Sequence, residues 1–572
     1  MNEQITGIIL IFLSAILLAY PLGKYFAGVF SGTGISSIML PLEGLIYKIS
    51  GIDPAKEMDW KSFLKAMLTI NMLWFIYAFF MLIFQGYLPF NPDGNAGQSP
   101  DLAFNTAISF LVNCDLQHYS GESGVTYLTQ IFVLCFLQFV SAATGIAALV
   151  AVFKALKEKT TSTLGNFWVL FTRAITRILL PISIITAILL AYNGTPSGFE
   201  GKDTITTLQG DSVSVSRGPV AAMVAIKHLG TNGGGWFGTN SAHPFENPNY
   251  FTAAIELIAQ MIIPIAMIFA LGFYLGKRKL SMVIFGVMTT GLLLLLIPTI
   301  VSELNGNPAI EKLGIAQPSG AMEGKEVRFG SGLSAYWSIV TTIISTGSVN
   351  SMHDSSMPLS GLMQLLGMMV NAFYGGCGVG ILNYFIYIII AVFISGLMVG
   401  RTPEFMGHKV EAREIKIVAL VTLLSSILIK GFTAYAAFLV THDPDNGWVV
   451  PPSLWLNNPG AHGFTEILYE FTSANANNGS GFEGLGDNNF FWNITTGISL
   501  LLGRFLPIIA PVAIAGLLAK KKYIPESPGT LRVDSVTFGA MTFGIILIIN
   551  ALSFFPALAL GPLTEYFSLD LK

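Results

Sequence analysis

The chain has 572 residues, of which 52% are hydrophobic and only 11% charged, and its formal net charge is −3. A soluble domain typically carries about 25% charged residues, so this composition, with a mean hydropathy of +0.64, indicates a membrane protein and excludes a soluble enzyme. The slightly negative charge gives no basis for a nucleic-acid partner, and three cysteines are too few for a disulfide framework.

Ten apolar stretches are long enough to cross a membrane, because a spanning helix needs about 20 mostly apolar residues. The first has no cleavage signal and continues into bulky residues, so it is expected to be retained. In chain order the expected spans are 5–27, 64–86, 127–152, 168–192, 251–276, 280–302, 381–400, 416–440, 493–519 and 535–560.

Four long segments between these spans have a different composition, with a short apolar run followed by a stretch rich in Asn, Thr, Ser and Gly. They are 87–126, 193–250, 303–360 and 441–492. Their apolar runs are too short to cross a membrane, and irregular backbone survives at membrane depth only where it is buried or lines a wet path. We therefore expect four re-entrant segments.

The distribution of basic residues orients the chain. The first and last re-entrant segments contain no Lys or Arg, and the other two contain three each. By the positive-inside rule the Lys- and Arg-rich connections are cytoplasmic. The re-entrant segments and both termini are then expected outside. The basic connections carry Lys48, Lys56 and Lys61; Lys154, Lys157 and Lys159; Lys277, Arg278 and Lys279; Arg401, Lys409, Arg413 and Lys416; and Lys520, Lys521 and Lys522.

The order span, re-entrant segment, span occurs four times in one orientation. This predicts an all-α integral membrane fold of about ten spanning helices, with four tandem units around a pseudo-fourfold pore like that of a potassium channel. The expected division is 1–63 (first span and cytoplasmic connection), 64–152, 153–279, 280–415 (with a broken intramembrane segment), 416–522 and 523–572 (last span).

The four re-entrant segments contain candidates for an ion-selectivity filter. A dehydrated potassium ion needs a cage of oxygens without strong charge, and rings of backbone carbonyls supply it in potassium channels. Glycine reaches the unusual backbone angles that turn successive carbonyls inward. No carboxylate is common to all four segments, which fits potassium better than calcium. The candidate filter residues are Asn113, Cys114, Asp115 and Gln117; Thr231, Asn232, Gly233 and Gly234; Ser345, Thr346, Gly347 and Ser348; and Asn477, Asn478, Gly479 and Ser480.

The strings LGTNGGGWFGTNSAHPFENPN, STGSVNSMHDS, GLMVGRTPEFMGHK and NNGSGFEGL resemble the signatures of the potassium-translocating subunit of the Kdp potassium-transporting ATPase. The resemblance covers nearly the whole chain and implies ATP-driven, high-affinity potassium import across a bacterial inner membrane. It also implies that a separate P-type subunit hydrolyses ATP and that small single-span accessory subunits take part.

By this resemblance the filter positions of the family fall on Gln117, Gly233, Gly347 and Gly479. Cys114 and Asp115 stand where the family pattern has Thr and Asn, and Asn371 stands where it has a carboxylate. These departures leave open the details of the site.

No nucleotide site is expected on this chain, and it is not expected to be an enzyme by itself. It lacks the GxxxxGK[ST] phosphate loop and a DKTGT-like phosphorylation motif. The cluster Gly375–Gly380 resembles a dinucleotide fingerprint, but it lies in a membrane segment without a βαβ context.

Arg401, Arg504 and Asn371 are candidates for the ion path or its gate, together with the apolar segment that contains Asn371. Arg504 lies inside the ninth expected span, where a charge normally faces a cavity or a partner. Arg401 reads as a positive-inside anchor, and the resemblance adds a possible gating role. Segment 358–376 is short and Gly-rich, so it is expected to break below the third filter and obstruct the pore. His353 and Asp354 follow that filter and either shape the vestibule or form a local cap.

Two other functions compete with the pump subunit. A stand-alone potassium channel or an uptake subunit of the Trk/Ktr type would share the fourfold architecture, but the number of spans and the motif strings count against it. A secondary transporter with inverted repeats is disfavoured because all four units have the same orientation. Co-purification with an ATPase would separate the first alternative from the pump.

Overall fold

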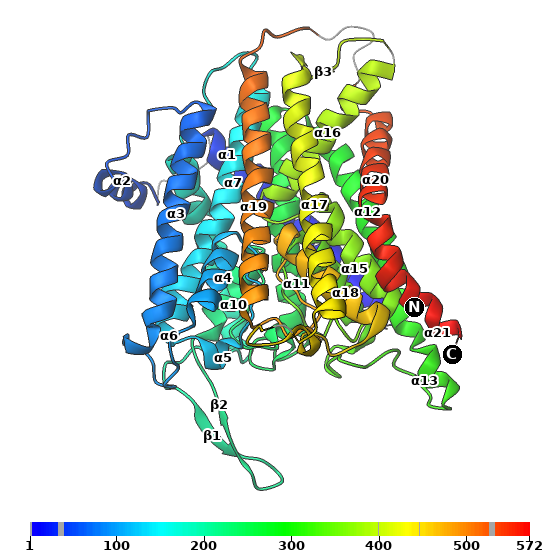
Figure 1. The fold of residues 1–572 in the computed structure, drawn as a ribbon. Coiled ribbons are helices and arrows are strands. Elements are labelled where there is room, and N and C mark those ends of the chain that lie inside the picture. The colour runs from blue at the N-terminus through cyan, green and yellow to red at the C-terminus, as the bar shows by residue number, and fades with distance from the viewer. Residues whose placement is uncertain (1–2, 33–38, 399, 446, 526–531, 572) are drawn as a thin grey trace.

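The computed structural model describes residues 3–32, 39–398, 400–445, 447–525 and 532–571, and it is a bundle of long helices (Figure 1). Its ten helices long and apolar enough to cross a membrane confirm the ten expected spans. Residue 399, near the end of the expected span 381–400, lies outside the described residues, as do the chain ends and parts of the first and last expected divisions. The long helices are α1 (Glu3–Ser31), α3 (Trp60–Phe84), α7 (Phe136–Lys157), α8 and α9 (Phe167–Arg173 and Leu180–Tyr192), α11 (Tyr250–Leu275), α12 (Arg278–Asn305), α16 (Val379–Met398), α17 (Ala412–His442), α19 (Phe490–Ala519) and α20 (Val536–Leu558).

Four shorter helices lie inside the bundle, one in each expected re-entrant segment. They are α4 (Pro100–Leu111), α10 (Val220–Leu229), α14 (Gly330–Ile344) and α18 (Gly460–Ala476). Nearly all of their residues are buried. A helix that is buried all round, yet too short to span, must end inside the protein, where its last carbonyls need partners.

A fifth short helix, α15 (Pro358–Val370), packs against α12, α14 and α18. It ends at Asn371, whose φ of 43° is left-handed. The chain then runs irregularly until α16 begins at Val379. The segment is thus broken at the point where its sequence becomes rich in glycine.

The segments that connect the long helices lie mostly at the two ends of the bundle (Figure 1). The hairpin of β3 (Glu404–Phe405) and β4 (His408–Lys409) lies at one end, and helix α2 (Leu40–Ile49) lies at the flank of the bundle beside α3. The hairpin of β1 (Asp203–Thr206) and β2 (Ser212–Val215) projects from the other end, toward which both termini also lie.

Helix α1 packs along α11, and it precedes the four units expected from the sequence. Gly23 permits this approach, since a Cβ there would lie 2.6 Å from the carbonyl oxygen of Ala266. Helix α19 contacts α4, α7, α17 and α18, and it therefore joins the first unit to the fourth.

The two small hairpins are additions to the expected all-helical fold. Strands β1 and β2 pair antiparallel from Asp203 opposite Val215 to Thr206 opposite Ser212. Their Thr, Ile and Val residues favour extended backbone. Three π-helical turns, Gln130–Cys135, Ala174–Leu179 and Ala559–Leu563, also interrupt the long helices, and hydropathy alone carries no signal for them.

Candidate functional site

Each of the four helices α4, α10, α14 and α18 runs into a tripeptide whose first and third residues have left-handed backbone. L-residues other than glycine, asparagine and aspartate rarely adopt this conformation, so its fourfold recurrence is a structural repeat. The tripeptides are Asn113 to Asp115 (φ 63° and 55° at the ends), Thr231 to Gly233 (52° and 96°), Ser345 to Gly347 (59° and 85°) and Asn477 to Gly479 (52° and 104°).

The four tripeptides touch one another in a closed order, and together we call them the ring. A Cβ on Gly233 would lie 2.0 Å from the carbonyl oxygen of Thr346, and one on Gly347 would lie 2.1 Å from that of Asn478. A Cβ on Gly479 would lie 2.0 Å from the carbonyl oxygen of Cys114. The first tripeptide meets the second where Asn113 Nδ2 donates to the carbonyl of Thr231 at 2.7 Å. Gly234, which directly follows the second tripeptide, adjoins Asp115, whose Cβ would lie 2.5 Å from a Cβ on that glycine.

The register of the first tripeptide differs from the sequence expectation. The backbone pattern aligns Asp115, and not Gln117, with Gly233, Gly347 and Gly479. Gln117 lies two residues further on, where its Oε1 accepts from the N–H of Gly235 at 2.8 Å and its Nε2 donates to the carbonyl of Gly235 at 3.1 Å. Gln117 therefore links the segment after the first tripeptide to the segment after the second. We call this side of the ring its rim.

Asp115 is fully buried between these two units. Its Oδ2 accepts from Gln138 Nε2 at 2.7 Å and from the N–H of Gly234 at 3.2 Å. Its Oδ1 has no hydrogen-bond partner within the described residues. The other three tripeptides have glycine at this position, so only one quarter of the ring carries an acid. That acid links the first unit to the second.

The amide side chains of the ring are used to fix its backbone. Asn113 Nδ2 donates to the carbonyl of Thr231 at 2.7 Å, and Asn478 Nδ2 donates to that of Thr341 at 2.7 Å. The hydroxyl of Ser141 lies 3.0 Å from Asn113 Oδ1 and 2.9 Å from Asn232 Oδ1, and these two oxygens share its one proton. Ring positions are thus held by packed side chains, which is the preorganisation that a precise ligand cage requires.

The irregular stretch 371–378, here called the floor segment, contacts all four tripeptides or the helix ends beside them. The hydroxyl of Ser345 donates to Asn371 Oδ1 at 3.1 Å, and Asn371 Nδ2 donates to the carbonyl of Ala476 at 3.1 Å. The N–H of Cys377 donates to Thr231 Oγ1 at 2.9 Å. A Cβ on Gly376 would lie 3.8 Å from Asn113 Nδ2. The floor segment therefore crosses the end of the ring opposite to Gln117.

A small cavity of about 60 Å³ lies beside the floor segment, between α15, α16, α17, α18, α19 and α20. Polar groups line it within this apolar region, among them Asn371, Asn383, Asn475 and Asn550.

Arg504, on α19, is 4% exposed and lies close to the floor segment. It donates to the carbonyl of Ser141 at 3.2 Å. A Cβ on Gly145 would lie 3.2 Å from Arg504 Nη2 and 2.3 Å from the carbonyl oxygen of Cys377. Within the described part of the chain no carboxylate forms an ion pair with Arg504, so an unpaired guanidinium faces the base of the ring.

Arg401 is not brought to this site. It is exposed and follows the distant end of α16, a helix that starts beside the floor segment. Twenty helical residues cover about 30 Å. This position matches an anchor at the bundle surface better than a role at the ring.

A buried polar network behind the second and third tripeptides was not anticipated from the sequence. Lys227 Nζ donates to Asn240 Oδ1 at 2.7 Å and to Ser241 Oγ at 2.8 Å, and it pairs with Glu246. His228 Nε2 lies 2.9 Å from Ser348 Oγ. The sequence feature that could have indicated this network is the pair Lys227 and His228 in an otherwise apolar run. If such a run is buried, its charged residues require partners.

Beyond the third tripeptide, His353 and Asp354 join the fourth unit. His353 Nδ1 lies 2.9 Å from the hydroxyl of Tyr469. Asp354 Oδ1 lies 2.9 Å from His462 Nε2, and Glu565 Oε1 lies 2.7 Å from His462 Nδ1. Burial lowers the pKa of His462, but the carboxylates of Asp354 and Glu565 outweigh this and raise the pKa to about 10.

This raised pKa predicts a pH-dependent stability. The folded pKa exceeds the ordinary value of 6.5, so the stabilisation is complete below pH 6.5 and is lost as the pH rises toward 10. We expect the unfolding temperature of the chain in detergent to fall more between pH 6 and pH 10 in the wild type than in His462→Gln. The control is His442→Gln, which replaces an exposed histidine and should behave as the wild type. Equal falls of the unfolding temperature in the wild type and His462→Gln would contradict the raised pKa of His462.

Ten helices long and apolar enough to cross a membrane and four loops that close into a ring define an all-α, multi-pass membrane protein with a central, backbone-lined site. A sequence model described as the potassium-transporting ATPase A subunit matches residues 9–567. The chain belongs to that family, which places it among the potassium-transport proteins of membranes.

Curated relatives carry the name potassium-transporting ATPase potassium-binding subunit. That of Flavobacterium johnsoniae is 67% identical over 573 residues, covering 100% of both chains. That of Bacteroides thetaiotaomicron is 57% identical over 570 residues, again covering 100% of both. That of Geobacillus kaustophilus is 46% identical over 561 residues, covering 98% of each. Among solved structures, the potassium transporter TrkH from Vibrio parahaemolyticus aligns with a TM-score of 0.49 at 13% identity, over 89% of this chain and 98% of that one.

Proposed function

We propose that the ring is a potassium-selectivity filter and that the chain passes potassium inward within an ATP-driven import complex. One observation carries the proposal. Four tripeptides with the same alternating left-handed backbone touch in a closed order, with three glycines where any Cβ would strike the next tripeptide. Such a ring offers backbone carbonyls without a carboxylate in every quarter, which suits a weakly hydrated monovalent cation.

The proposed filter comprises the sixteen candidate residues named from the sequence, with Asp115 as the counterpart of the three glycines. The short helices α4, α10, α14 and α18 end at it, and the negative end of each helix dipole favours a cation there. The division of the chain into four tandem units with an additional first and last span belongs to the same proposal.

The floor segment and Arg504 are the proposed barrier against leakage. Asn371 and Cys377 bind groups at the base of the ring, and the guanidinium of Arg504 lies near the carbonyl of Cys377. A positive charge on the ion path repels potassium unless another event moves it or compensates it. This arrangement suits a pump, in which the filter selects the ion and a separate polypeptide supplies energy.

For the remaining parts of the complex we propose a P-type catalytic subunit, together with small single-span accessory subunits, in the inner membrane of a bacterium. The re-entrant segments and both termini face outward, as the basic connections suggest. The decisive experiment is to purify the chain with its bound partners and measure ATP hydrolysis against potassium concentration. Hydrolysis that ignores potassium, or a chain that conducts potassium alone and binds no ATPase, would refute the proposal.

Replacing Gln117 with arginine is expected to lower the apparent potassium affinity by about tenfold or more. Arginine has no acceptor for the N–H of Gly235, and an unsatisfied buried donor costs about 1–3 kcal/mol. It also places a cation at the rim of the ring. Potassium-dependent uptake measures the change, and Gln209→Arg, at an exposed glutamine in the turn between β1 and β2, is the matched control. Equal affinities in the two variants would remove Gln117 from the filter rim.

A further inference from the structure

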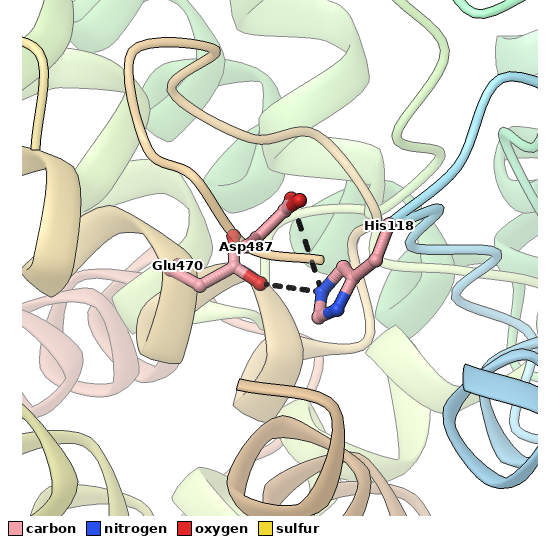
Figure 2. Close-up of side chains that lie close together, drawn as sticks. All are labelled: His118, Glu470 and Asp487. Atoms are coloured by element: carbon pink, nitrogen blue, oxygen red, sulfur yellow. Dashed lines mark hydrogen bonds and ion pairs between the residues drawn. The ribbon is translucent and has the colours of Figure 1, made fainter. Parts of the chain in front are cut away.

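A second cluster lies beyond the ring, on the side of Gln117, where His118, Glu470 and Asp487 converge (Figure 2). His118 follows the first tripeptide, Glu470 lies on α18, and Asp487 lies in the connection before α19. His118 and Glu470 are almost completely buried, and the side chain of Asp487 is 29% exposed. The proposed filter function does not use this cluster.

The hydrogen bonds of His118 determine which of its nitrogens faces the carboxylates. Asn493 Nδ2 donates to Asp101 Oδ2 at 2.8 Å, so the carbonyl oxygen of Asn493 points the other way. That oxygen lies 2.7 Å from His118 Nδ1 and therefore accepts the Nδ1 proton. In the neutral imidazole the lone pair is then on Nε2, which lies 3.1 Å from Glu470 Oε1 and 4.0 Å from Asp487 Oδ2 (Figure 2).

This is the arrangement of a metal-ligating histidine, whose other nitrogen donates to a fixed acceptor. The three ligand atoms lie within 4.8 Å of one another. In a tetrahedral site with ligands at about 2.0–2.2 Å, neighbouring ligand atoms are about 3.3 Å apart. Of the three separations, the 3.1 Å between His118 Nε2 and Glu470 Oε1 is close to this value. The two that involve Asp487 are closed by movement of its side chain, which is partly exposed.

We propose that His118, Glu470 and Asp487 form a site for a divalent transition cation, with zinc as the best-fitting ion, that fastens the first unit to the fourth at the rim of the ring. An imidazole ligand selects zinc over magnesium and calcium, which prefer all-oxygen sites. Two carboxylates neutralise the charge of the cation, and the exposed side of Asp487 leaves the fourth position open to water.

The alternative is an ion pair between a protonated His118 and Glu470 that binds no metal. The test uses the full chain purified in detergent with an affinity tag that contains no histidine. After treatment with a chelator the protein is equilibrated with zinc chloride, and bound zinc is counted by elemental analysis. We expect His118→Gln and Asp487→Asn each to lose one equivalent of zinc that the wild type and His442→Gln retain.

Loss of a residue that only orients a metal ligand typically weakens metal binding about 10–100-fold. Removal of His118 or Asp487, which are proposed to bind the ion directly, is expected to weaken zinc binding by more than this. Zinc should raise the unfolding temperature of the wild type but not of these variants, and excess magnesium should not displace it. Asp487→Asn changes a partly exposed loop residue, so it keeps the test valid if His118→Gln fails to fold. Equal zinc content in the wild type and a folded variant would overturn the proposal.

Discussion

Replacing Gly233 with aspartate is expected to abolish discrimination between potassium and sodium, or to prevent assembly of the ring. A Cβ at this position would lie 2.0 Å from the carbonyl oxygen of Thr346 and less than 3 Å from the backbone of Gly347. These are backbone atoms of the neighbouring tripeptide, so no rotamer relieves the contact. The φ of 96° adds strain for any L-residue, and the carboxylate adds a second acid to a ring in which Asp115 alone carries one.

The experiment compares rubidium, potassium and sodium in transport assays of a graded series. Gly233→Ala contains the steric effect without the charge, and Gly431→Ala, on α17 where a Cβ meets nothing within 4 Å, is the matched control. We expect the alanine at 233 to reduce selectivity at least about tenfold, since strained or overpacked sites cost about 1–3 kcal/mol. Wild-type selectivity in a well-assembled Gly233→Asp protein would show that Gly233 does not line the filter.

Replacing Arg504 with glutamine is expected to uncouple potassium movement from ATP hydrolysis while the chain still assembles. A charged residue in the middle of a spanning helix costs about 2.5–3.5 kcal/mol, and within the described residues Arg504 has no carboxylate to offset this. Its contacts are instead a carbonyl of α7 and the neighbourhood of Cys377. Glutamine can still donate a hydrogen bond but removes the positive charge beside the floor segment.

Coupling is measured as potassium ions moved per ATP hydrolysed, together with passive potassium leakage through reconstituted vesicles. Arg504→Lys should retain most of the coupling because it keeps the charge, and Arg401→Gln should behave as the wild type because Arg401 is exposed and far from the ring. Normal coupling in Arg504→Gln would reduce Arg504 to a structural link between α19 and α7. A loss of coupling in Arg401→Gln would instead revive its gating role.

Hydropathy alone predicted the ten spans, and the short apolar runs predicted the buried helices, because burial in lipid or protein leaves a strong local signal. The break after α15 was also predictable, since Asn371 and the following glycines interrupt an apolar run. The register of the ring was not predictable from the sequence. Aspartate tolerates left-handed backbone better than glutamine does, but this preference is weak, and the resemblance pointed to Gln117 as the counterpart of a glycine.

The contacts between units were equally beyond sequence reasoning. His118 meets Glu470 across 352 positions of the chain, and Asn113 meets Thr231 across 118. Spacing along a chain carries information about one helix or strand, whereas these pairs depend on how separate units pack. The unpaired charge of Arg504 was visible in the sequence, but the carbonyl that receives its hydrogen bond was not.

All four quarters of the ring belong to one polypeptide, so each residue occurs there as a single copy. In a pore made from four identical chains, an aspartate in the place of Asp115 would appear four times and surround the axis with acid groups, as in sites that prefer calcium. In such a pore the floor segment, residues 371–378, would also occur four times, and its four copies would compete for the one space at the base of the ring. Fusion of the quarters removes both constraints, so one quarter can hold an acid and another can supply the obstruction, and each can change without its three counterparts.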